Sequence, residues 1–392
     1  MIFHGLTMQD VLPTDHQQAI LVGRVWRPGI GPSLAVVRGG DLIDITSPTT
    51  PTMASLFEQD DVGKWISHAN GSNIGSIETI LANSDEKNKN PDQPFLLSPV
   101  DLQPIKAAGV TFAVSLLERV IEEQARGNPE HANAVRASIN DMLGGDLRSL
   151  QPGSKNAEDL KAALIKKNIW SQYLEVGIGP DPEIFTKCQI MSSVGFGANV
   201  GIDAKSTWNN PEPEIAVIVS RTGRIMGATL ANDVNLRDFE GRSALLLSKA
   251  KDNNASCSLG PFIRVFNEHY TYDDLLTAHV SLKINGTDGF KLESVSKMDE
   301  ISRSPYELVQ ATINKNHQYP DGFILLLGTM FAPTQDRDFE NAGFTHHPGD
   351  VVSISSEKLG RLINQVQYCH DCEPWTFGVQ ALMKNLTLRQ LL

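Results

Sequence analysis

Three acidic side chains near the middle of the chain have the types and spacing of ligands for a hard divalent cation. Glu212 and Glu214 stand at the head of the apolar run 214–220, which reads as a strand. Successive strand side chains point to opposite faces, so these two carboxylates share one face. Two glycines then predict a turn, and a second apolar stretch, 228–231, leads into Asp233. Crowded carboxylates repel one another unless a cation neutralises them, and Mg²⁺, Mn²⁺ or Ca²⁺ prefers such oxygen ligands.

A pair of glutamates on a strand is more often a solvated outer face, so the neighbouring motifs must decide between the two interpretations. The motifs that follow are, in order, Asn232-Asp233, Arg237-Asp238, Lys251 and Gly260-Pro261. A Glu-x-Glu pair, an Asn-Asp-x-x-x-Arg-Asp segment, a lysine and a Gly-Pro turn in this order resemble the fumarylacetoacetate hydrolase superfamily. The resemblance spans roughly residues 112–366.

The resemblance implies a set of site residues, a fold and an assembly. It implies Glu212, Glu214 and Asp233 as metal ligands, Lys251 as the active-site lysine and Thr329 as a substrate contact. Lys187 stands in the Phe-x-Lys segment before the metal strand, where it either has a structural role, which we rank first, or binds the substrate carboxylate. The implied fold class is mostly β with α, a rolled mixed β-sandwich. The implied assembly is a homodimer or homotetramer.

The apolar periodicity of residues 111–126 predicts a helix whose polar face carries several glutamates. Small superfamily members carry an aromatic residue, a histidine and a glutamate at three-residue steps on a helix that closes over the metal. Phe112, Ser115 and Glu118 fall on these positions, and about one turn separates the serine from the glutamate. A serine cannot act as the base that the histidine provides in hydrolytic members. This substitution, and the short interval between the second and third metal ligands, resemble the branch of 2-keto-3-deoxy sugar acid dehydratases.

The length of 392 residues favours two domains over one. Short β-prone runs at the start of the chain predict a small β-rich N-terminal domain over residues 1–98. Residues 99–392 are expected to form the catalytic domain of the fumarylacetoacetate hydrolase type, with a helical lid or insert over 111–175. Two more helices are expected within that insert, at 132–142 and 157–167.

The composition is that of an ordinary globular protein, with 41% hydrophobic and 20% charged residues. The net charge of −12 opposes binding to phosphate backbones, and no basic cluster with interleaved aromatic residues occurs. No apolar stretch approaches the length of a membrane span, and the first 22 residues lack the apolar core of a signal peptide. We therefore expect no nucleic acid and no membrane as partner, and a cytoplasmic location.

The four cysteines are too few for a disulfide framework in a chain of this length. Cys188 and Cys257 fall in expected core strands, which favours buried structural thiols. Cys369 and Cys372 form a single Cys-x-x-Cys motif without the second pair that a structural zinc needs, which argues against a zinc or redox role.

Two further expectations concern loops. Arg237 and Asp238 are expected to pair with each other and to fix the segment after the third metal ligand. His346 and His347 adjoin a Pro-Gly-Asp turn and are interpreted as loop residues rather than metal ligands.

These residues together predict a metal-dependent dehydratase. A 2-keto acid offers its carboxylate and keto oxygen to a hard cation, which acidifies the carbon next to the ketone. Lys251 is expected to move that proton if burial or the metal lowers its pKa. Glu118, protonated in an apolar lid, is the expected acid for the departing hydroxyl. Ser115 would orient that hydroxyl or a water, and Thr329 would bind the carboxylate end.

The predicted cofactor is Mg²⁺, with Mn²⁺ and Ca²⁺ as alternatives. The predicted substrate is a 2-keto-3-deoxy pentonate such as 2-keto-3-deoxy-D-xylonate, converted to 2-oxoglutarate semialdehyde in the catabolism of pentoses and sugar acids. Two alternatives stay open on the same scaffold. One is a hydrolase or decarboxylase that cleaves a C–C bond of a 2,4-diketo or oxaloacetate-like acid, and the other is a non-catalytic binder of keto acids.

Overall fold

The computed structural model describes residues 5–129, 131–132, 150–166, 170–340 and 342–392. The strands are β1 Ile20–Arg27, β2 Gly31–Arg38, β3 Asp41–Asp44, β4 Ser72–Ser76, β5 Phe95–Leu97, β6 Ile105–Gly109, β7 Glu183–Cys188, β8 Asn199–Ile202, β9 Asn209–Asn210, β10 Pro213–Val219, β11 Ile225–Asp233, β12 Asn235–Leu236, β13 Cys257–Val265, β14 His279–Asn285, β15 Lys291–Lys297, β16 Phe323–Leu326, β17 Val351–Ser356 and β18 Gly360–Tyr368.

The helices are mostly short. They are α1 Met8–Val11, α2 Met53–Phe57, α3 Val62–His68, α4 Ile77–Asn83, α5 Ala113–Gln124, α7 Lys155–Lys166, α8 Gln172–Ile178, α9 Arg237–Glu240, α10 Leu247–Lys251, α11 Tyr272–Leu276, α12 Pro305–Thr312 and α13 Val379–Leu388, with 3₁₀ turns η1 Ala244–Leu246 and η2 Met298–Glu300.

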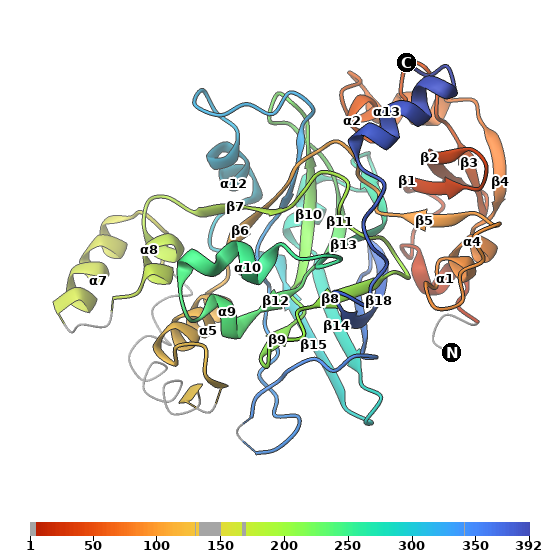
Figure 1. Ribbon diagram of the computed structural model, residues 1–392. Coiled ribbons are helices and arrows are strands. Elements are labelled where there is room, and N and C mark those ends of the chain that lie inside the picture. The colour runs from red at the N-terminus through yellow and green to blue at the C-terminus, as the bar shows by residue number, and fades with distance from the viewer. Residues whose placement is uncertain (1–4, 130, 133–149, 167–169, 341) are drawn as a thin grey trace.

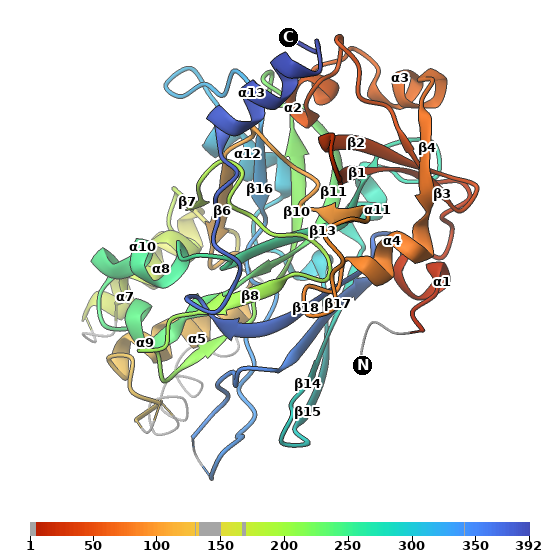
Figure 2. The same cartoon turned by 45° about the vertical axis from the view of Figure 1, so that its right-hand side comes forward.

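Two large mixed sheets dominate the molecule (Figures 1 and 2). The first has 11 strands, in the order β4-β3-β2-β1-β13-β11-β10-β16-β6-β7, with β5 paired to β1. The second has five strands, in the order β15-β14-β17-β18-β8. Most neighbours are antiparallel, but β16 and β6 are parallel, as are β18 and β8. The predicted fold class, mostly β with α and a mixed sheet arrangement, is confirmed.

One apolar core joins the two sheets. Alternate residues of β10, such as Ile215 and Val217, belong to the same buried cluster as Leu282 of β14 and Ile354 of β17. The other face of β10 carries Ala216, which belongs to a second buried cluster. Because β10 is apolar on both faces, it can lie at the centre of the large sheet and hold the acidic residues at its start rigidly.

The N-terminal strands continue the large sheet. β1 pairs antiparallel with β13, with Ile20 opposite Val265. The predicted hairpin is present, since Arg38 faces Asp41 across the turn and Gly39-Gly40 both have positive φ, as such a tight turn requires. A continuous sheet therefore crosses the expected boundary after residue 98, and the division into two domains stays a prediction.

A helical layer covers the end of the sheet that carries the acidic residues (Figure 1). The helix predicted over 111–126 is α5, and the helix predicted over 157–167 is α7. The helix predicted over 132–142 falls largely outside the described residues. The apolar side of α5 packs on α8, where Gly177 has no side chain to obstruct Leu116; a Cβ there would lie 2.7 Å from the Leu116 methyl carbon.

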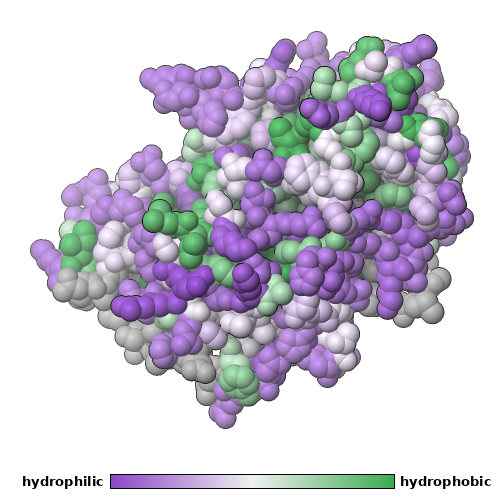
Figure 3. All heavy atoms as spheres, in the orientation of Figure 1, coloured by the Kyte–Doolittle hydropathy of each residue, from purple (hydrophilic) through white to green (hydrophobic). Residues whose placement is uncertain are grey.

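The face shown in Figure 3 is largely hydrophilic, with apolar residues scattered in small groups. At the C-terminus, α13 lies over the N-terminal strands, where the Asn385 amide donates to the Ile30 carbonyl at 2.7 Å. Among the described residues, none of the helices combines the length and apolar character needed to cross a bilayer.

Candidate metal centre

The three predicted metal ligands lie together on one face of the β10–β11 ladder. The register places Pro213 opposite Asn232, and the Asp233 amide donates to the Glu212 carbonyl at 3.0 Å, so Glu212 and Asp233 oppose each other. Glu214 lies two residues along the same strand and therefore on the same face. One carboxylate oxygen from each lies within 4.8 Å of the others, and each residue is only 1% exposed.

Lys251, at the end of α10, supplies a positive charge to this cluster. Its Nζ donates to Glu212 at 2.5 Å and to Asp233 at 3.2 Å. Burial lowers the pKa of Lys251, but the two carboxylates outweigh that effect and the pKa lies above its ordinary value. The lowered pKa expected for a proton-accepting lysine is not found in this arrangement, because the lysine itself neutralises two of the acids.

Glu214 has a different environment from the other two acids. It accepts from the Gly328 amide at 2.8 Å and from the Thr329 hydroxyl at 3.3 Å. Burial, followed by the charges of Asp233 and Glu212, holds the pKa of Glu214 well above its usual value. Glu212 shows the opposite direction, because Lys251 and Arg119 outweigh its burial and lower its pKa to about 2.

This electrostatic pattern fits a divalent cation. Three buried carboxylates converge, and Glu214 has a raised pKa because it is buried and because its two neighbours are negatively charged. A hard cation with oxygen ligands relieves that repulsion. Glu212, Glu214 and Asp233 are thus the residues that would hold the ion.

Thr329 contacts the metal ligands directly. Its hydroxyl donates to Glu212 at 2.7 Å, and Gly328 before it has a positive φ of 104° that lets the backbone approach Glu214. The expected contact of Thr329 with a substrate carboxylate stays a prediction.

Lys187 is fully buried behind Asp233. Its Nζ lies 2.9 Å from the Asp233 carboxylate and donates to the backbone carbonyls of Val234 and Lys251. These contacts join β7 to the segments that carry a metal ligand and the active-site lysine. They favour the structural role that we ranked first over contact with a substrate carboxylate.

The helix α5 lies over the site, and the side of the helix that faces the site carries buried polar residues. Ser115, Glu118, Arg119 and Glu122 are all buried, at spacings that place them on one side of the helix. Ser115 donates to the carbonyl of Phe112 at 3.0 Å, as a helical serine commonly does. Its expected role in orienting a hydroxyl or water stays a prediction.

The expected apolar surroundings of Glu118 are wrong. Its carboxylate lies 3.2 Å from the Arg237 guanidinium, which also binds Glu122 at 2.7 Å and the Pro333 carbonyl at 3.0 Å. An arginine at this distance favours the ionised carboxylate. The sequence pattern misleads because Arg237 lies more than a hundred residues away along the chain.

Arg119 was not singled out from the sequence, yet it contacts a metal ligand. Its guanidinium donates to Glu212 and to Glu122, and it lies 3.5 Å from Glu240. Burial lowers the pKa of Arg119, but these three acids raise it well above its ordinary value. The available signal was the stripe of polar residues at helical spacing on 115–122, which reads equally well as a solvated face.

The expected pair between Arg237 and Asp238 is also wrong. Arg237 points to α5 and stacks on Trp208, with its guanidinium carbon 4.3 Å from the ring centroid. Asp238 points the other way, where it accepts from the Ser206 hydroxyl at 2.7 Å and the Thr207 amide at 3.1 Å. Adjacent residues at the start of a helix project in different directions, so each finds its own partners.

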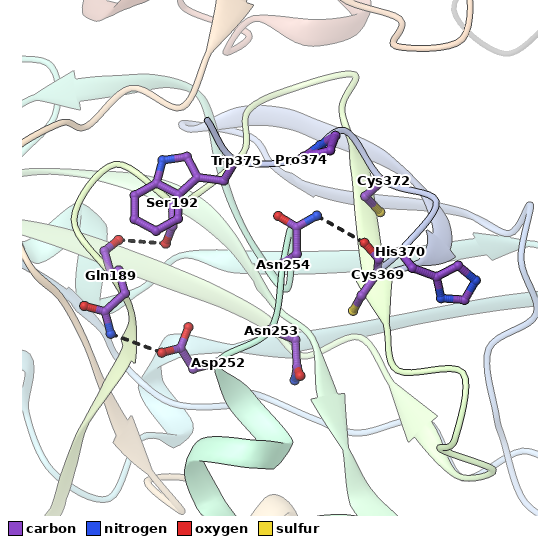
Figure 4. Close-up of a pocket in the computed structure, with 10 residues that line it drawn as sticks. All are labelled: Gln189, Ser192, Asp252, Asn253, Asn254, Cys369, His370, Cys372, Pro374 and Trp375. Carbon is purple, nitrogen blue, oxygen red and sulfur yellow. Dashed lines mark hydrogen bonds between the residues drawn. The ribbon is translucent and has the colours of Figure 1, made fainter. Parts of the chain in front are cut away.

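The Cys-x-x-Cys motif lines a separate cavity of about 430 Å³ (Figure 4). The Asn254 amide donates to the Cys369 carbonyl at 3.1 Å and thereby ties this turn to the segment after Lys251. Burial and the charge of Asp203 raise the pKa of Cys369 to about 11, and burial and Cys369 raise that of Cys372 to about 12. Burial thus disfavours the reactive thiolate form of both cysteines, and the expected absence of a zinc or redox role stays a prediction.

The remaining thiols agree with their interpretation as buried structural residues, and both histidines lie in loops. Cys188 and Cys257 are both buried. His346 is buried against Asp350 at 3.0 Å. His347 lies between the exposed carboxylates of Asp338, at 3.1 Å, and Asp288, at 3.7 Å, so each ring nitrogen faces an acid. That His347 is not a metal ligand stays a prediction, because one ligand atom each from Asp288, Asp338 and His347 lies within 4.8 Å of the others.

Comparison with known proteins agrees with this geometry. Residues 172–367 match the family model described as fumarylacetoacetate hydrolase C-terminal. A 2-dehydro-3-deoxy-D-arabinonate dehydratase of Saccharolobus solfataricus is 30% identical over 214 residues, which is 54% of this chain and 66% of the relative. A protein of Haloferax volcanii named "Probable 2-keto-3-deoxyxylonate dehydratase" is 29% identical over 271 residues, which is 68% of this chain and 73% of the relative.

The fold is also shared with a solved structure. A 2-keto-3-deoxy-D-arabinonate dehydratase complexed with magnesium and 2,5-dioxopentanoate superposes with a TM-score of 0.60 at 20% identity, over 89% of this chain and 99% of that one. The names of the relatives support a dehydratase. With the matched family model spanning half of the chain, this protein belongs to the fumarylacetoacetate hydrolase family.

Proposed function

We propose that this chain is a metal-dependent hydro-lyase that converts a 2-keto-3-deoxy pentonate to 2-oxoglutarate semialdehyde. The observation that carries the proposal is the buried convergence of Glu212, Glu214 and Asp233 with Lys251 among them. Ser115 supports a dehydratase over a hydrolase. It occupies the position at which hydrolytic members of the fumarylacetoacetate hydrolase superfamily carry a histidine base.

The reaction requires one proton to leave C3 and a hydroxyl to leave C4 with a proton, as water. The C3–C4 double bond that forms then moves to C4–C5, as C5 loses a proton and C3 regains one. The resulting enol becomes the aldehyde when its oxygen loses a proton and C4 gains one. Magnesium, when bound, supplies a Lewis acid for the keto and carboxylate oxygens of the substrate. We assign the proton at C3 to Lys251, because its Nζ lies among the proposed metal ligands. Since Glu212 and Asp233 hold the pKa of Lys251 above its ordinary value, the lysine must lose its own proton before it can accept this one.

Glu118 is our candidate for the leaving hydroxyl. It lies one residue before Arg119 on the covering helix and is held by Arg237. Since that ion pair favours the carboxylate, Glu118 must take up a proton before it can donate one to the hydroxyl. The helix α5 contributes by excluding water, because the metal-ligand carboxylates beneath it are buried.

The direct test is incubation of the pure protein with Mg²⁺ and 2-keto-3-deoxy-D-xylonate or its arabinonate epimer, followed by proton NMR and mass spectrometry. Loss of one water with all five carbons retained supports the proposal. Release of pyruvate, or loss of carbon dioxide, would show instead that the chain cleaves a C–C bond.

Two variants separate catalysis from simple binding. Lys251→Ala should lose turnover and also the exchange of the C3 proton with deuterated solvent, while it still binds Mn²⁺. Glu118→Gln should keep the C3 exchange and lose the elimination, because only the second proton transfer is affected. No turnover of any keto acid by the parent protein would favour a non-catalytic binder.

A further inference from the structure

Two buried asparagines beside the metal ligands have polar atoms without partners. Asn210 and Asn235 are both 0% exposed. Within the described part of the chain, neither amide atom of Asn235 has a hydrogen-bond partner, nor does the side-chain oxygen of Asn210. The Asn210 nitrogen donates only to the Pro211 carbonyl, at 2.8 Å. Leaving a buried polar atom unpaired is costly, so three such atoms at one place favour a partner that binds there, either a ligand or ordered water.

The strand register places these asparagines directly next to the carboxylates. β9 pairs with β12 as a separate two-stranded sheet, with Asn210 opposite Asn235. Its register has the same offset as that of the β10–β11 ladder, although residues 211, 212 and 234 between the two lie outside the strands. Glu212 and Asp233 therefore form one rung, and the two asparagines form a rung two residues further along, on the same face. At about 3.4 Å per residue the two rungs lie about 7 Å apart. The helix α9 contacts both short strands and lies beside them in Figure 1.

A third buried asparagine shows why position matters. Asn232 is 0% exposed and has both amide atoms unpartnered among the described residues, as Asn235 does. It precedes Asp233 by one residue and pairs with Pro213 and Ser258, so it faces the opposite side of the ladder. On that side its neighbours two residues away, Leu230 and Val234, belong to the core between the sheets. Asn232 is therefore a matched internal control of the same residue type.

We propose that Asn210 and Asn235 bind the C5 hydroxyl of the substrate and set the preference of this enzyme for hydroxylated keto acids. The inference rests on the proposed function, since it takes the keto and carboxylate end of the substrate to lie at the carboxylate rung. A hydroxyl donates one hydrogen bond and accepts others, and the Asn235 amide offers both an acceptor and a donor. The next rung, about 7 Å away, is within reach of the far end of a five-carbon acid held at its first two carbons.

The substrate pair that tests this inference differs at one atom. 4-Hydroxy-2-oxopentanoate keeps the C4 hydroxyl that leaves as water, but has a methyl group where 2-keto-3-deoxy pentonate has the C5 hydroxymethyl group. A site built to hydrogen-bond a hydroxyl discriminates strongly against the analogue that lacks it. We expect kcat/KM of the parent protein to favour the hydroxylated acid by about a hundredfold or more. Proton NMR can monitor the loss of substrate in both reactions.

Asn235→Ala should lose this preference selectively. We expect kcat/KM for the hydroxylated acid to fall about a hundredfold and kcat/KM for the methyl analogue to stay within about threefold, so that the ratio approaches one. Asn232→Ala, the matched control, should keep the ratio of the parent. If Asn235→Ala does not fold, Asn210→Ala takes its place in the same comparison.

A binding measurement separates recognition from chemistry. Neither 5-hydroxy-2-oxopentanoate nor 2-oxopentanoate has a C4 hydroxyl to lose, so both serve as inhibitors. The parent should bind the hydroxylated inhibitor about tenfold more tightly, Asn235→Ala should bind the two equally, and Mn²⁺ affinity should not change.

Three results would overturn the inference. The ratio could persist in Asn235→Ala, which would mean that ordered water alone satisfies the amides. It could collapse equally in Asn232→Ala, which would indicate a general loss of structure. The parent could also turn over both acids with the same kcat/KM, which would refute the hydroxyl contact and leave the dehydratase proposal intact. Failure of the parent to dehydrate either acid would refute the hydroxyl contact and the dehydratase proposal together.

Discussion

Replacing Glu214 and replacing Glu212 by glutamine should have opposite effects on the metal-free protein. Glu214 contacts an amide and a hydroxyl, and its pKa is raised because it is buried beside two other acids. A glutamine mimics the neutral form of that carboxyl and removes the repulsion. Glu212, in contrast, holds Lys251 and Arg119, so Glu212→Gln leaves two buried cations under-compensated.

The expected magnitudes follow from these contacts. Removing one partner of a buried ion pair costs about 3–5 kcal/mol, so in a chain of 392 residues Glu212→Gln should lower Tm of the metal-free protein by about 4–6 °C. Glu214→Gln should leave that Tm unchanged or raise it. When Mg²⁺ is present at about a hundred times its Kd, the parent should gain about 2.7 kcal/mol. A hundredfold weaker site in Glu214→Gln would gain only about 0.4 kcal/mol.

Calorimetry at pH 7.5, first with EDTA and then with excess Mg²⁺ or Mn²⁺, measures both effects on the same samples. The reasoning predicts a crossing pattern, in which Glu214→Gln is at least as stable as the parent without metal and less stable with it. An equal loss of Tm for Glu214→Gln and Glu212→Gln in EDTA would refute the claim that like charges destabilise the empty cluster.

Three further predictions test the surroundings of the site. Arg237→Met should lower the free energy of unfolding in urea by about 3–5 kcal/mol, because it removes the buried cation that pairs with both Glu118 and Glu122. Arg237→Lys should recover part of the loss, and equal stability of all three proteins would contradict this prediction. Burial and Glu240 raise the pKa of Glu183 to about 7, so the folded state holds a proton that the unfolded state loses above its ordinary pKa near 4.5. The free energy of unfolding should therefore fall between pH 4.5 and 7, by at most about 1.4 kcal/mol per pH unit. In a series of chemical denaturations across this pH range, Glu183→Gln should flatten that fall. An unchanged slope in the variant would exclude Glu183 as its source. Cys369→Ser and Cys372→Ser should leave turnover unchanged, and both thiols should react slowly with an aromatic disulfide at pH 7.5; rapid modification with loss of activity would revive a redox role.

Local features of the site could be predicted from the sequence because they depend on neighbours along the chain. Strand alternation places Glu212 and Glu214 on one face, and the glycine turn between β10 and β11 returns Asp233 to the same face. The periodicity of residues 111–126 predicts α5 to within two residues at each end. The order of these motifs along the chain was sufficient to predict the family and the fold class.

Contacts between distant segments could not be predicted in this way. The polar side of α5 reads as a solvated face, yet Glu118 and Glu122 are buried because Arg237 lies against them. The pairing of β1 with β13 is equally invisible in the sequence, since nothing local specifies which edge of a sheet a strand joins.

The sequence by itself determined which carboxylates face the same way, because alternation along a strand is a property of the backbone. Only the tertiary structure decided which charges those carboxylates meet, and which amides lie beside them without partners. Burial makes those contacts energetically important, and burial depends on how the helices close over the sheet.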